Sequence, residues 1–460
     1  MGQYIKASLM KSLFILLWLV FACLHSLSAQ KRCHCRHFIF IRGNGSAYID
    51  GNQITIHPGD TVCIPAALYM SLSIRNIHGT QEKPVIFINC GGLVKIGAGT
   101  YGISIVNSSY FRITGTGDST LFYGIKVFNP APNGYDNAGI GISGTSSDAE
   151  VDHIEISKAH AGILVYNIPN CYPNTWKGSH TFRNLSFHDL YIHRIIDFGF
   201  LAGYPGPEPT LKCNGKEIKV SPQQINGISI YHCRIDSIGG GGIQVSESPE
   251  GVRIFNNTVE HYGLRPGAQA GIVMGGLVNG ACYDNLVSNG NGSGIQVYGT
   301  GAIMVYNNIL DRTAANNQDA IFVDDRPSPG YKPLHVYLIN NTIIGSGRYA
   351  IKILNTNKTM NADNLVYNNL LLDCKKTYYF GVGHQLSHNI IHMDPVWARL
   401  DSEFMPRPGS PVIGAGMNMS KLGITTDFNG NPRRIGHSFN VGAVQILPKS
   451  TSQLIPSSLQ

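Results

Sequence analysis

The stretch VRIFNNTVEHYG, residues 252–263, places two adjacent asparagines between two short apolar runs. The same arrangement, with an asparagine pair or a near equivalent at its centre, recurs along the chain. Its further copies, which align without gaps, are ISIYHCRI from Ile228, GACYDNLV from Gly280, IMVYNNIL from Ile303, VYLINNTI from Val336 and NLVYNNLL from Asn364. Such recurrence predicts a tandem repeat.

A second motif, G-I-x-V or a close variant after a small residue, marks each unit of the repeat. Its last five copies follow one another at steps of 29, 23, 26 and 30 residues: GGIQV at 241, AGIVM at 270, SGIQV at 293, DAIFV at 319 and YAIKI at 349. Units of this length that each contain two or three short strands are typical of a solenoid. No run has the 3.6-residue apolar stripe of a helical repeat. The chain is therefore predicted to be an all-β solenoid.

The asparagines are explained by the stacking of coils. In a parallel β-solenoid each coil lies about 4.8 Å above the last, so equivalent residues form columns. A buried amide can then bond to its own copies, and asparagine also tolerates the left-handed backbone of a tight bend. We therefore assign a structural role to the asparagine column: Asn257, Asn285, Asn308, Asn341 and Asn369.

An aromatic column runs beside the asparagines. It comprises Tyr231, Phe255, Tyr283, Tyr306 and Tyr367, with Ile339 interrupting it. If exposed, such a column could stack against sugar rings, and if buried it fills the interior of the coil. We favour interior packing, which is common for aromatic residues at repeated positions.

The first residues predict export. Lys6 and Lys11 precede the apolar run SLFILLWLVFACL, which ends in SLSAQ. This run is shorter than the roughly 20 residues that span a bilayer, and no later segment is comparable. Residues 1–29 are therefore a predicted secretory signal peptide, with cleavage after Ala29. Lipidation at Cys23 is the alternative. We expect a secreted or cell-surface protein without a transmembrane segment.

The net charge is +7 for 460 residues, and removing Lys6 and Lys11 leaves 7 − 2 = +5. A mildly basic surface of this kind favours binding to acidic polymers. The alternative is that the charge only keeps the protein soluble. Nucleic acid is not an expected partner, because no dense basic run accompanies the aromatic residues.

Cysteines are permitted to pair in an oxidising compartment. Cys171 and Cys213 lie in two polar, proline-containing loops, and we predict a disulfide between them. Cys233 and Cys282 fall inside the repeat and are predicted to be small buried residues. The stretch KRCHCRHF contains metal-ligand residue types but no distant second pair, so a metal site and a disulfide-tethered cap both stay open: Cys33, His34, Cys35 and His37.

The pattern x-G-I-x-V followed by V-x-I-x-N-N-x-I resembles the right-handed parallel β-helix of the pectate-lyase-like superfamily over about 100–390. PGDTVCIPAALYMSLSIRNIHGTQEKPVIFINCGG, from Pro58, resembles the first coils of secreted bacterial proteins akin to the chondroitinase B and alginate lyase group. DPVWARLDSEFMPRPGSPVIGAGMN with TDFNGNPRRIGHSFNVGAVQ resembles their closing segment. The resemblance implies about eleven coils. The predicted divisions are 1–29 signal peptide, 30–60 N-terminal cap, 61–390 β-helix, 391–446 closing segment and 447–460 polar tail.

The resemblance also implies an extracellular polysaccharide, possibly acidic, as the partner. This fold carries lyases, hydrolases, epimerases and non-catalytic adhesins. Elimination uses a Lys or Arg base, often with calcium, whereas hydrolysis uses two or three carboxylates on adjacent coils. We predict a polysaccharide-binding protein that cleaves its ligand by one of these routes, with calcium a candidate cofactor. A non-catalytic carbohydrate-binding protein is the alternative.

Strand alternation directs the x residue of G-I-x-V and the residue after Val outward. One patch on three neighbouring coils gathers polar residues at these positions. Its candidate catalytic residues are Asp319, Asp324, Asp325, Arg326 and Lys352, and its candidate binding residues are Gln296 and Tyr298. A surface ion network or a calcium site that closes a loop is the alternative.

A second candidate region lies between 129 and 225, where long loops interrupt the regular coil length. Loops on a rigid scaffold often carry binding residues. Trp176, Tyr172 and Tyr204, together with Tyr135, offer rings for stacking against sugars. The alternative is that these rings pack the loops onto the solenoid. The sugar, its linkage and the oligomeric state are not predicted.

Overall fold

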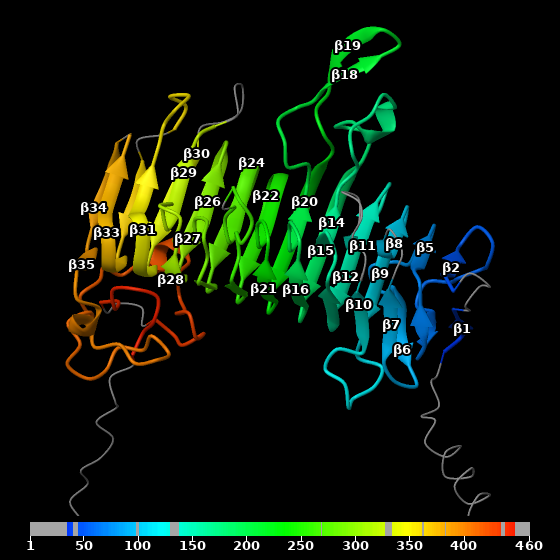
Figure 1. Ribbon diagram of the computed structural model, residues 1–460, viewed down its shortest axis with the longest axis horizontal. Helices are drawn as coiled ribbons and strands as arrows, with labels where there is room; N and C mark the ends of the chain where they lie inside the picture. The colour runs from blue at the N-terminus through cyan, green and yellow to red at the C-terminus, as the bar shows by residue number, and fades with distance from the viewer. Residues whose placement is uncertain are drawn as a thin grey trace, which may run out of the picture.

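The computed structural model describes residues 35–39, 45–97, 101–128, 138–267, 269–326, 334–360, 363–381, 383–433 and 438–446. Within these ranges 33 strands form one continuous network of parallel pairs. Each strand pairs with its equivalents one coil away, so the chain winds as an elongated solenoid (Figure 1). The predicted all-β parallel solenoid is confirmed. Residues 1–29 and 447–460, together with Tyr135, lie outside the described residues.

Three parallel sheets, here named A, B and C, form the walls. Sheet A contains the G-I-x-V motif. It comprises β2 (Ala47–Asp50), β5 (Leu72–Arg75), β8 (Tyr101–Val106), β11 (Ala138–Ser143), β14 (Ala161–Val165), β17 (Phe200–Ala202), the start of β22 (Ile243–Phe255) and of β24 (Ile272–Tyr283), β26 (Ile295–Tyr298), β29 (Ile321–Asp324), and the ends of β31 (Thr342–Ile353) and β33 (Leu370–Phe380).

Sheet B contains the run that precedes the asparagine pair. It comprises β1 (His37–Phe38), β3 (Thr61–Pro65), β6 (Val85–Cys90), β9 (Ser109–Thr114), β12 (Ser147–Asp152), β15 (Thr181–His188), β20 (Gln224–Tyr231), the ends of β22 and β24, β27 (Gly301–Tyr306), β30 (Leu334–Ile339), β32 (Asn364–Tyr367) and β34 (His384–Ser387).

Sheet C contains the run that follows the pair. It comprises β4 (Leu68–Tyr69), β7 (Val94–Gly97), β10 (Ile125–Phe128), β13 (Ile154–Ser157), β16 (Tyr191–Ile195), β21 (Arg234–Ile238), β23 (Thr258–Glu260), β25 (Leu286–Ser288), β28 (Ile309–Thr313), the starts of β31 and β33, and β35 (Ile390–His392). The other elements are the hairpin β18 (Thr210–Cys213) and β19 (Lys216–Lys219), and the 3-10 helices η1 (Pro173–Thr175), η2 (Pro395–Ala398) and η3 (Ser420–Leu422).

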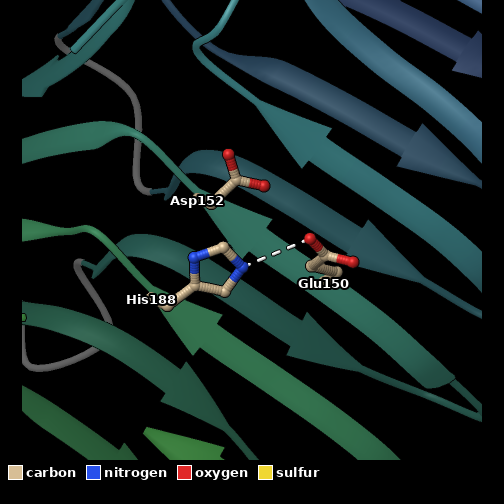
Figure 2. Close-up of side chains that lie close together, drawn as sticks. All are labelled: Glu150, Asp152 and His188. Carbon is tan, nitrogen blue, oxygen red and sulfur yellow. Dashed lines mark hydrogen bonds and ion pairs between the residues drawn. The ribbon is translucent and has the colours of Figure 1, made fainter. Parts of the chain in front are cut away.

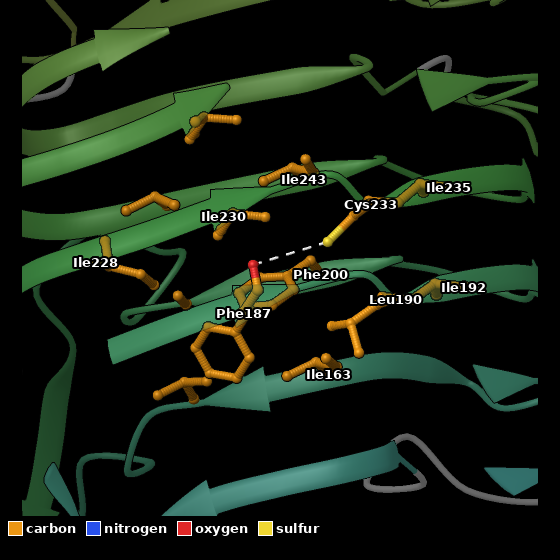
Figure 3. Packing of buried hydrophobic residues seen from close by; sticks show 14 of the residues in the cluster. Ile163, Phe187, Leu190, Ile192, Phe200, Ile228, Ile230, Cys233, Ile235 and Ile243 are labelled. Atoms are coloured by element: carbon orange, nitrogen blue, oxygen red, sulfur yellow. Dashed lines mark hydrogen bonds between the residues drawn. The ribbon is translucent and has the colours of Figure 1, made fainter. Parts of the chain in front are cut away.

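The core fills the space between the three sheets. Alternation along each strand points every second residue inward, and these inward positions are mostly isoleucine and valine. Figure 3 shows one section, in which Phe187 and Phe200 meet edge to face at 4.8 Å between ring centroids. Cys233 lies in the same layer, and the predicted burial of Cys233 and Cys282 is confirmed at 2% and 0% exposure.

The predicted asparagine column forms a continuous ladder inside the solenoid. The side-chain amide nitrogen of each asparagine donates to the amide oxygen of the next, at 2.9–3.0 Å from Asn257 through Asn369. The same oxygen accepts the backbone N–H of the preceding asparagine at 2.9–3.1 Å. Asn389 extends the ladder by one coil. Each buried amide is thus satisfied by its neighbouring copies.

The two members of each asparagine pair have different roles. The left-handed bend belongs to the first member, with φ of 54° at Asn307, 56° at Asn340 and 58° at Asn368. These first members lie outside the ladder and hold the closing segment: their amide nitrogens donate to the backbone oxygens of Thr426, of Asn440 and Gly442, and of Met417, respectively. The sequence prediction had combined the bend and the ladder in one residue.

Arg433 anchors the closing segment and is only 1% exposed. Its guanidinium donates to the side chain of Asn307 at 2.9 Å and to the backbone oxygens of Gly442 and Ala443 at 3.0 and 2.8 Å. Burial lowers the pKa of Arg433 to about 10, although Asp427 and Asp284 oppose the shift.

We expect Arg433→Lys to lower the free energy of unfolding by about 2 kcal/mol, because an ammonium group cannot reach these acceptors together. Urea unfolding would measure the loss. Arg312→Lys, at a side chain that is 69% exposed, is the control. An equal effect of the two substitutions would contradict the anchoring role.

The aromatic column lies outside the core, so the prediction of interior packing is wrong. Ile230 and Ile254 point inward, and the rings that follow them in sequence lie half-buried on the outer face of sheet B. The rings of Tyr231, Phe255, Tyr283 and Tyr306 stack at 4.9, 5.0 and 4.8 Å with interplanar angles of 7°, 2° and 1°. Because each face covers the next, the rings within the stack offer only their edges to a ligand.

The N-terminal end is tied down by a disulfide. Cys35 pairs with Cys63, so its sulfur is not available as a metal ligand, and the metal interpretation of KRCHCRHF is wrong for this residue. His37 instead contacts Asp60 at 3.0 Å. Cys33 and His34 lie outside the described residues. Within the described ranges, no helix is long and apolar enough to span a membrane.

Candidate functional site

The predicted patch on sheet A is assembled by the register of the coils. Gln296 of β26 aligns with Phe322 of β29, which aligns with Lys352 of β31. Tyr298 aligns with Asp324 on the same two coils. The structure therefore brings these predicted residues side by side, as strand alternation requires.

The three aspartates of this patch are buried and engaged. Asp319 is 1% exposed and receives two bonds from the Arg348 guanidinium at 2.7 and 2.6 Å. Asp325 accepts the backbone N–H groups of Asn357 and Thr359 at 2.9 Å each. Burial opposes ionisation of Asp325, but these bonds outweigh it and hold its pKa below the usual range. These contacts tie neighbouring coils and the loop after β31 together.

The cations of the patch are more accessible. Asp324 is fully buried, and its carboxylate orients Arg326, whose side chain is 51% exposed. Lys352 holds its ammonium 5.6 Å from the Phe322 ring centroid and 5.5 Å from that of Tyr379. Two cations beside aromatic surface are suited to an anionic or hydroxyl-rich ligand.

The second predicted region is the pair of loops 166–180 and 203–223, which rise above the rest of the solenoid in Figure 1. A disulfide joins Cys171 to Cys213, the pair expected from the sequence. The Trp176 indole N–H donates to the backbone oxygen of Asn170 at 2.7 Å, so this residue holds its own loop. Tyr172 is 72% exposed. The Tyr204 ring packs edge to face on Tyr166.

Loss of this disulfide is expected to loosen the two loops while the coils stay intact. Cys213→Ser removes the covalent link between them, and the strands beneath are held independently by their ladders. We expect cleavage within 166–180 to become about 10-fold faster in limited proteolysis, with an unchanged far-ultraviolet circular dichroism spectrum. Unchanged cleavage would show that the loops hold one another without the disulfide.

Glu247, which the sequence analysis did not single out, lies at the base of these loops. It sits at a β-bulge of β22 with φ of 51°. Burial raises its pKa to about 7, with Lys177 opposing the rise and Glu208 adding to it. The pKa of Glu208 is lowered by hydrogen bonds from Ser221 and Lys219. Two neighbouring carboxyl groups thus differ in protonation near neutral pH.

A sequence signal for Glu247 exists. The residue lies where the next two coils have Gly276 and Gly299, so a glutamate precedes two glycines in this column. A Cβ atom on Gly276 would lie 2.6 Å from Oε1 of Glu247, and one on Gly299 would lie 2.0 Å from the backbone oxygen of Gly276. The edge between Glu247 and Asp325 therefore has two positions without side chains.

A cluster that could hold a metal ion lies on the outer face of sheet B. Ligand atoms of Glu150, Asp152 and His188 lie within 4.8 Å of one another (Figure 2). Arg112, however, donates to Asp152 at 2.7 Å and contacts Glu150 at 3.2 Å. Burial lowers the pKa of His188, but its bonds to Glu150 and Asp189 outweigh burial and raise it. Arg112 already occupies both carboxylates and offsets one of their two negative charges, which favours an ion network over a metal site.

A family model agrees with the fold over part of the chain, and several solved structures are similar to it. A family model described as "right handed beta helix region" matches residues 217–370. Pectate lyase Pel9A is 13% identical, with a TM-score of 0.44 over 89% of this chain and 96% of its own. GH136 lacto-N-biosidase from Eubacterium ramulus is 13% identical, with a TM-score of 0.41 over 74% and 63% of the two chains. Alginate lyase from a Paenibacillus species is 14% identical, with a TM-score of 0.36 over 75% and 98%.

No curated protein matches the chain in sequence. The three-sheet parallel topology and the family match over 217–370 show the right-handed parallel β-helix fold that the repeat pattern predicts. Sequence identities of 13–14% to these solved structures do not transfer an activity to this chain.

Proposed function

We propose that this chain is a secreted protein that binds an extracellular polysaccharide along the corner between sheets A and B and cleaves it by glycosidase-type chemistry. The observation that carries the proposal is the pair Glu247 and Glu208, whose pKa values are shifted in opposite directions. Such pairs provide an acid and a charged partner at one pH. Glu208 lies in one of the two long loops and Glu247 at their base, and such a position on a rigid solenoid suits a polymer ligand.

Glu247 is the proposed general acid. With a pKa of about 7, half of its carboxyl groups are protonated at neutral pH. Its proton would pass to the glycosidic oxygen as the bond from that oxygen to the sugar breaks. A water molecule would add its hydroxyl group to the sugar carbon, forming the new reducing end, and its remaining proton would go to the ionised carboxylate of Glu208, the proposed partner.

The predicted patch on sheet A is the proposed binding extension of this site. Arg326 and Lys352 lie further along the same edge and would hold acidic or hydroxyl groups of the chain, with Gln296 and Tyr298 beside them. Asp319, Asp324 and Asp325 are proposed to position this surface, because their carboxylates are buried and occupied. Tyr172 and Tyr204 offer rings on the opposite side of Glu247.

The test is a screen of the purified protein against uronic-acid and neutral polysaccharides, with and without calcium. Release of reducing ends without ultraviolet absorbance would support hydrolysis. Growth of absorbance from unsaturated products would instead indicate elimination. Lys352, Arg326 and Lys177 would then be the candidate bases.

A non-catalytic binding protein is the second candidate, and the saturation of all three patch aspartates favours it. Binding of a polysaccharide without turnover, measured by affinity electrophoresis and isothermal titration calorimetry, would establish it. Arg326→Ala with Lys352→Ala should then weaken binding. A matched Lys95→Ala, at an exposed lysine on sheet C, should leave binding unchanged.

A further inference from the structure

Within the described part of the chain, the last coil leaves the solenoid core open at its C-terminal end. Leu386 continues the inward column of Val366, and Ile391 continues that of Leu371. Val366 and Leu371 are 0% and 1% exposed, whereas Leu386 and Ile391 are 47% and 45% exposed. Side chains that belong to the core therefore reach the surface here.

No further strand within the described ranges pairs with the outer side of this coil. Among the described residues, 376–380 of β33 pair only with β31, β34 pairs only with β32, and β35 pairs only with β33. Their outward N–H and C=O groups form an incomplete ladder on each of the three sheets. Solenoids normally cover such ends with a capping element that has a polar outer face.

From Ala398 onward, the described part of the closing segment does not supply this cap, because it packs along the flank. Ala398 and Val412 pack against Leu370 and Leu372, and Ala443 with Val444 packs further back, against Ile309. In Figure 1 this segment lies beside the final coils, below β28 and β31. Five exposed apolar residues of the last strands and of the turn that follows them are here named the end face: Leu386, Ile391, Met393, Val396 and Trp397.

The three strand edges of the end face determine which kind of partner can cover it. A single peptide strand could complete one of the three edges but would leave the other two and most of the core uncovered. Covering all three edges needs three strands with the same triangular spacing. The end face of a second copy of the chain provides three strands with this spacing. A two-fold axis would set the facing edges antiparallel, which is a favourable pairing, and would make the contact isologous.

Size and charge agree with this partner. A stable interface uses about 20–30 residues from each side, and residues 376–381 with 383–398 form a stretch of that size. The formal charges of this stretch, on Lys376 and Asp394, cancel, and the five residues of the end face carry none, so two copies meet without net repulsion. We propose that two copies of this chain associate end to end through their end faces, forming a two-fold dimer with one continuous core.

Sedimentation velocity of the purified protein tests the proposal. We expect a dimer that dissociates on dilution, and Met393→Lys or Leu386→Lys should give a monomer with an unchanged near-ultraviolet circular dichroism spectrum. Met393 is 62% exposed, so its substitution does not disturb the fold. Leu68→Lys, at a 64% exposed leucine in the first coils, is the matched control and should stay dimeric.

Hydrogen exchange locates the contact. Amides of 384–387 and 390–392 should exchange more slowly as the protein concentration rises, and this dependence should vanish in Met393→Lys. A wild-type protein that is monomeric at every concentration would overturn the proposal. A dimer that survives both lysine substitutions would also overturn it.

Discussion

Replacement of Asn308 by alanine is expected to lower the free energy of unfolding by about 4 kcal/mol, the largest stability effect that we predict for a single residue outside the apolar core. The Oδ1 atom of Asn308 accepts both the backbone N–H and the side-chain amide of Asn285, at 3.1 and 2.9 Å. Its own amide nitrogen donates to Asn341 at 3.0 Å and to the backbone oxygen of Cys282 at 2.9 Å.

Alanine would leave these partners buried without a bond, and each unsatisfied group costs roughly 1–3 kcal/mol. Urea unfolding of both proteins measures the difference. Asn256→Ala is the matched control, since Asn256 is the exposed first member of its pair with φ of 53°. It should cost only about 1 kcal/mol, from backbone strain. Similar losses at the two positions would contradict the ladder.

Replacement of Glu247 by glutamine is expected to reduce turnover of the polysaccharide by about 10²–10⁴-fold, the usual contribution of a general acid. Binding should change little, because the amide occupies the same space. Wild-type turnover should fall as the pH rises above about 7, since the acid is then deprotonated. Glu250→Gln, at an exposed glutamate on the same strand, is the control for the loss of one charge.

The same variant should be more stable than the wild type at alkaline pH. The pKa of Glu247 is about 7 in the folded chain, against an ordinary value of 4.5. Between these values the folded state binds more protons than the unfolded state, so wild-type stability falls as the pH rises through this window. Glutamine removes that loss.

We expect Glu247→Gln to gain about 2 kcal/mol at pH 8 and nothing at pH 4. Thermal unfolding at both pH values measures this difference. A residue that lowers stability while supporting turnover is characteristic of an active site. A variant that keeps full turnover, or that loses stability at pH 8, would remove Glu247 from the proposed function.

The buried histidine of Figure 2 illustrates how far residue types alone can mislead. Glu150, Asp152 and His188 are typical metal ligands at a suitable spacing. The guanidinium of Arg112, however, comes from the preceding coil and forms ion pairs with both carboxylates, which offsets one of their two negative charges. A register shift of one residue would have turned this arginine inward and left the cluster uncompensated.

The sequence alone determined the solenoid, the stacking of its coils, the asparagine ladder and which residues of sheet A point outward. These features repeat: each residue contacts its own equivalent one coil away, so a pattern of residue types records the contact directly. Only the tertiary structure could separate the two roles of the asparagine pair, because Asn307 meets Thr426 from a part of the chain 119 residues away.

The loops follow no such pattern. Neither the occupation of Asp325 by the loop after β31 nor the shielding of Glu247 between Lys177 and Glu208 is repeated in another coil. The sequence therefore identified polar residues on the correct face but not which of them are satisfied. Contacts between equivalent residues are encoded by periodicity, whereas contacts made once depend on how distant segments fold against one another.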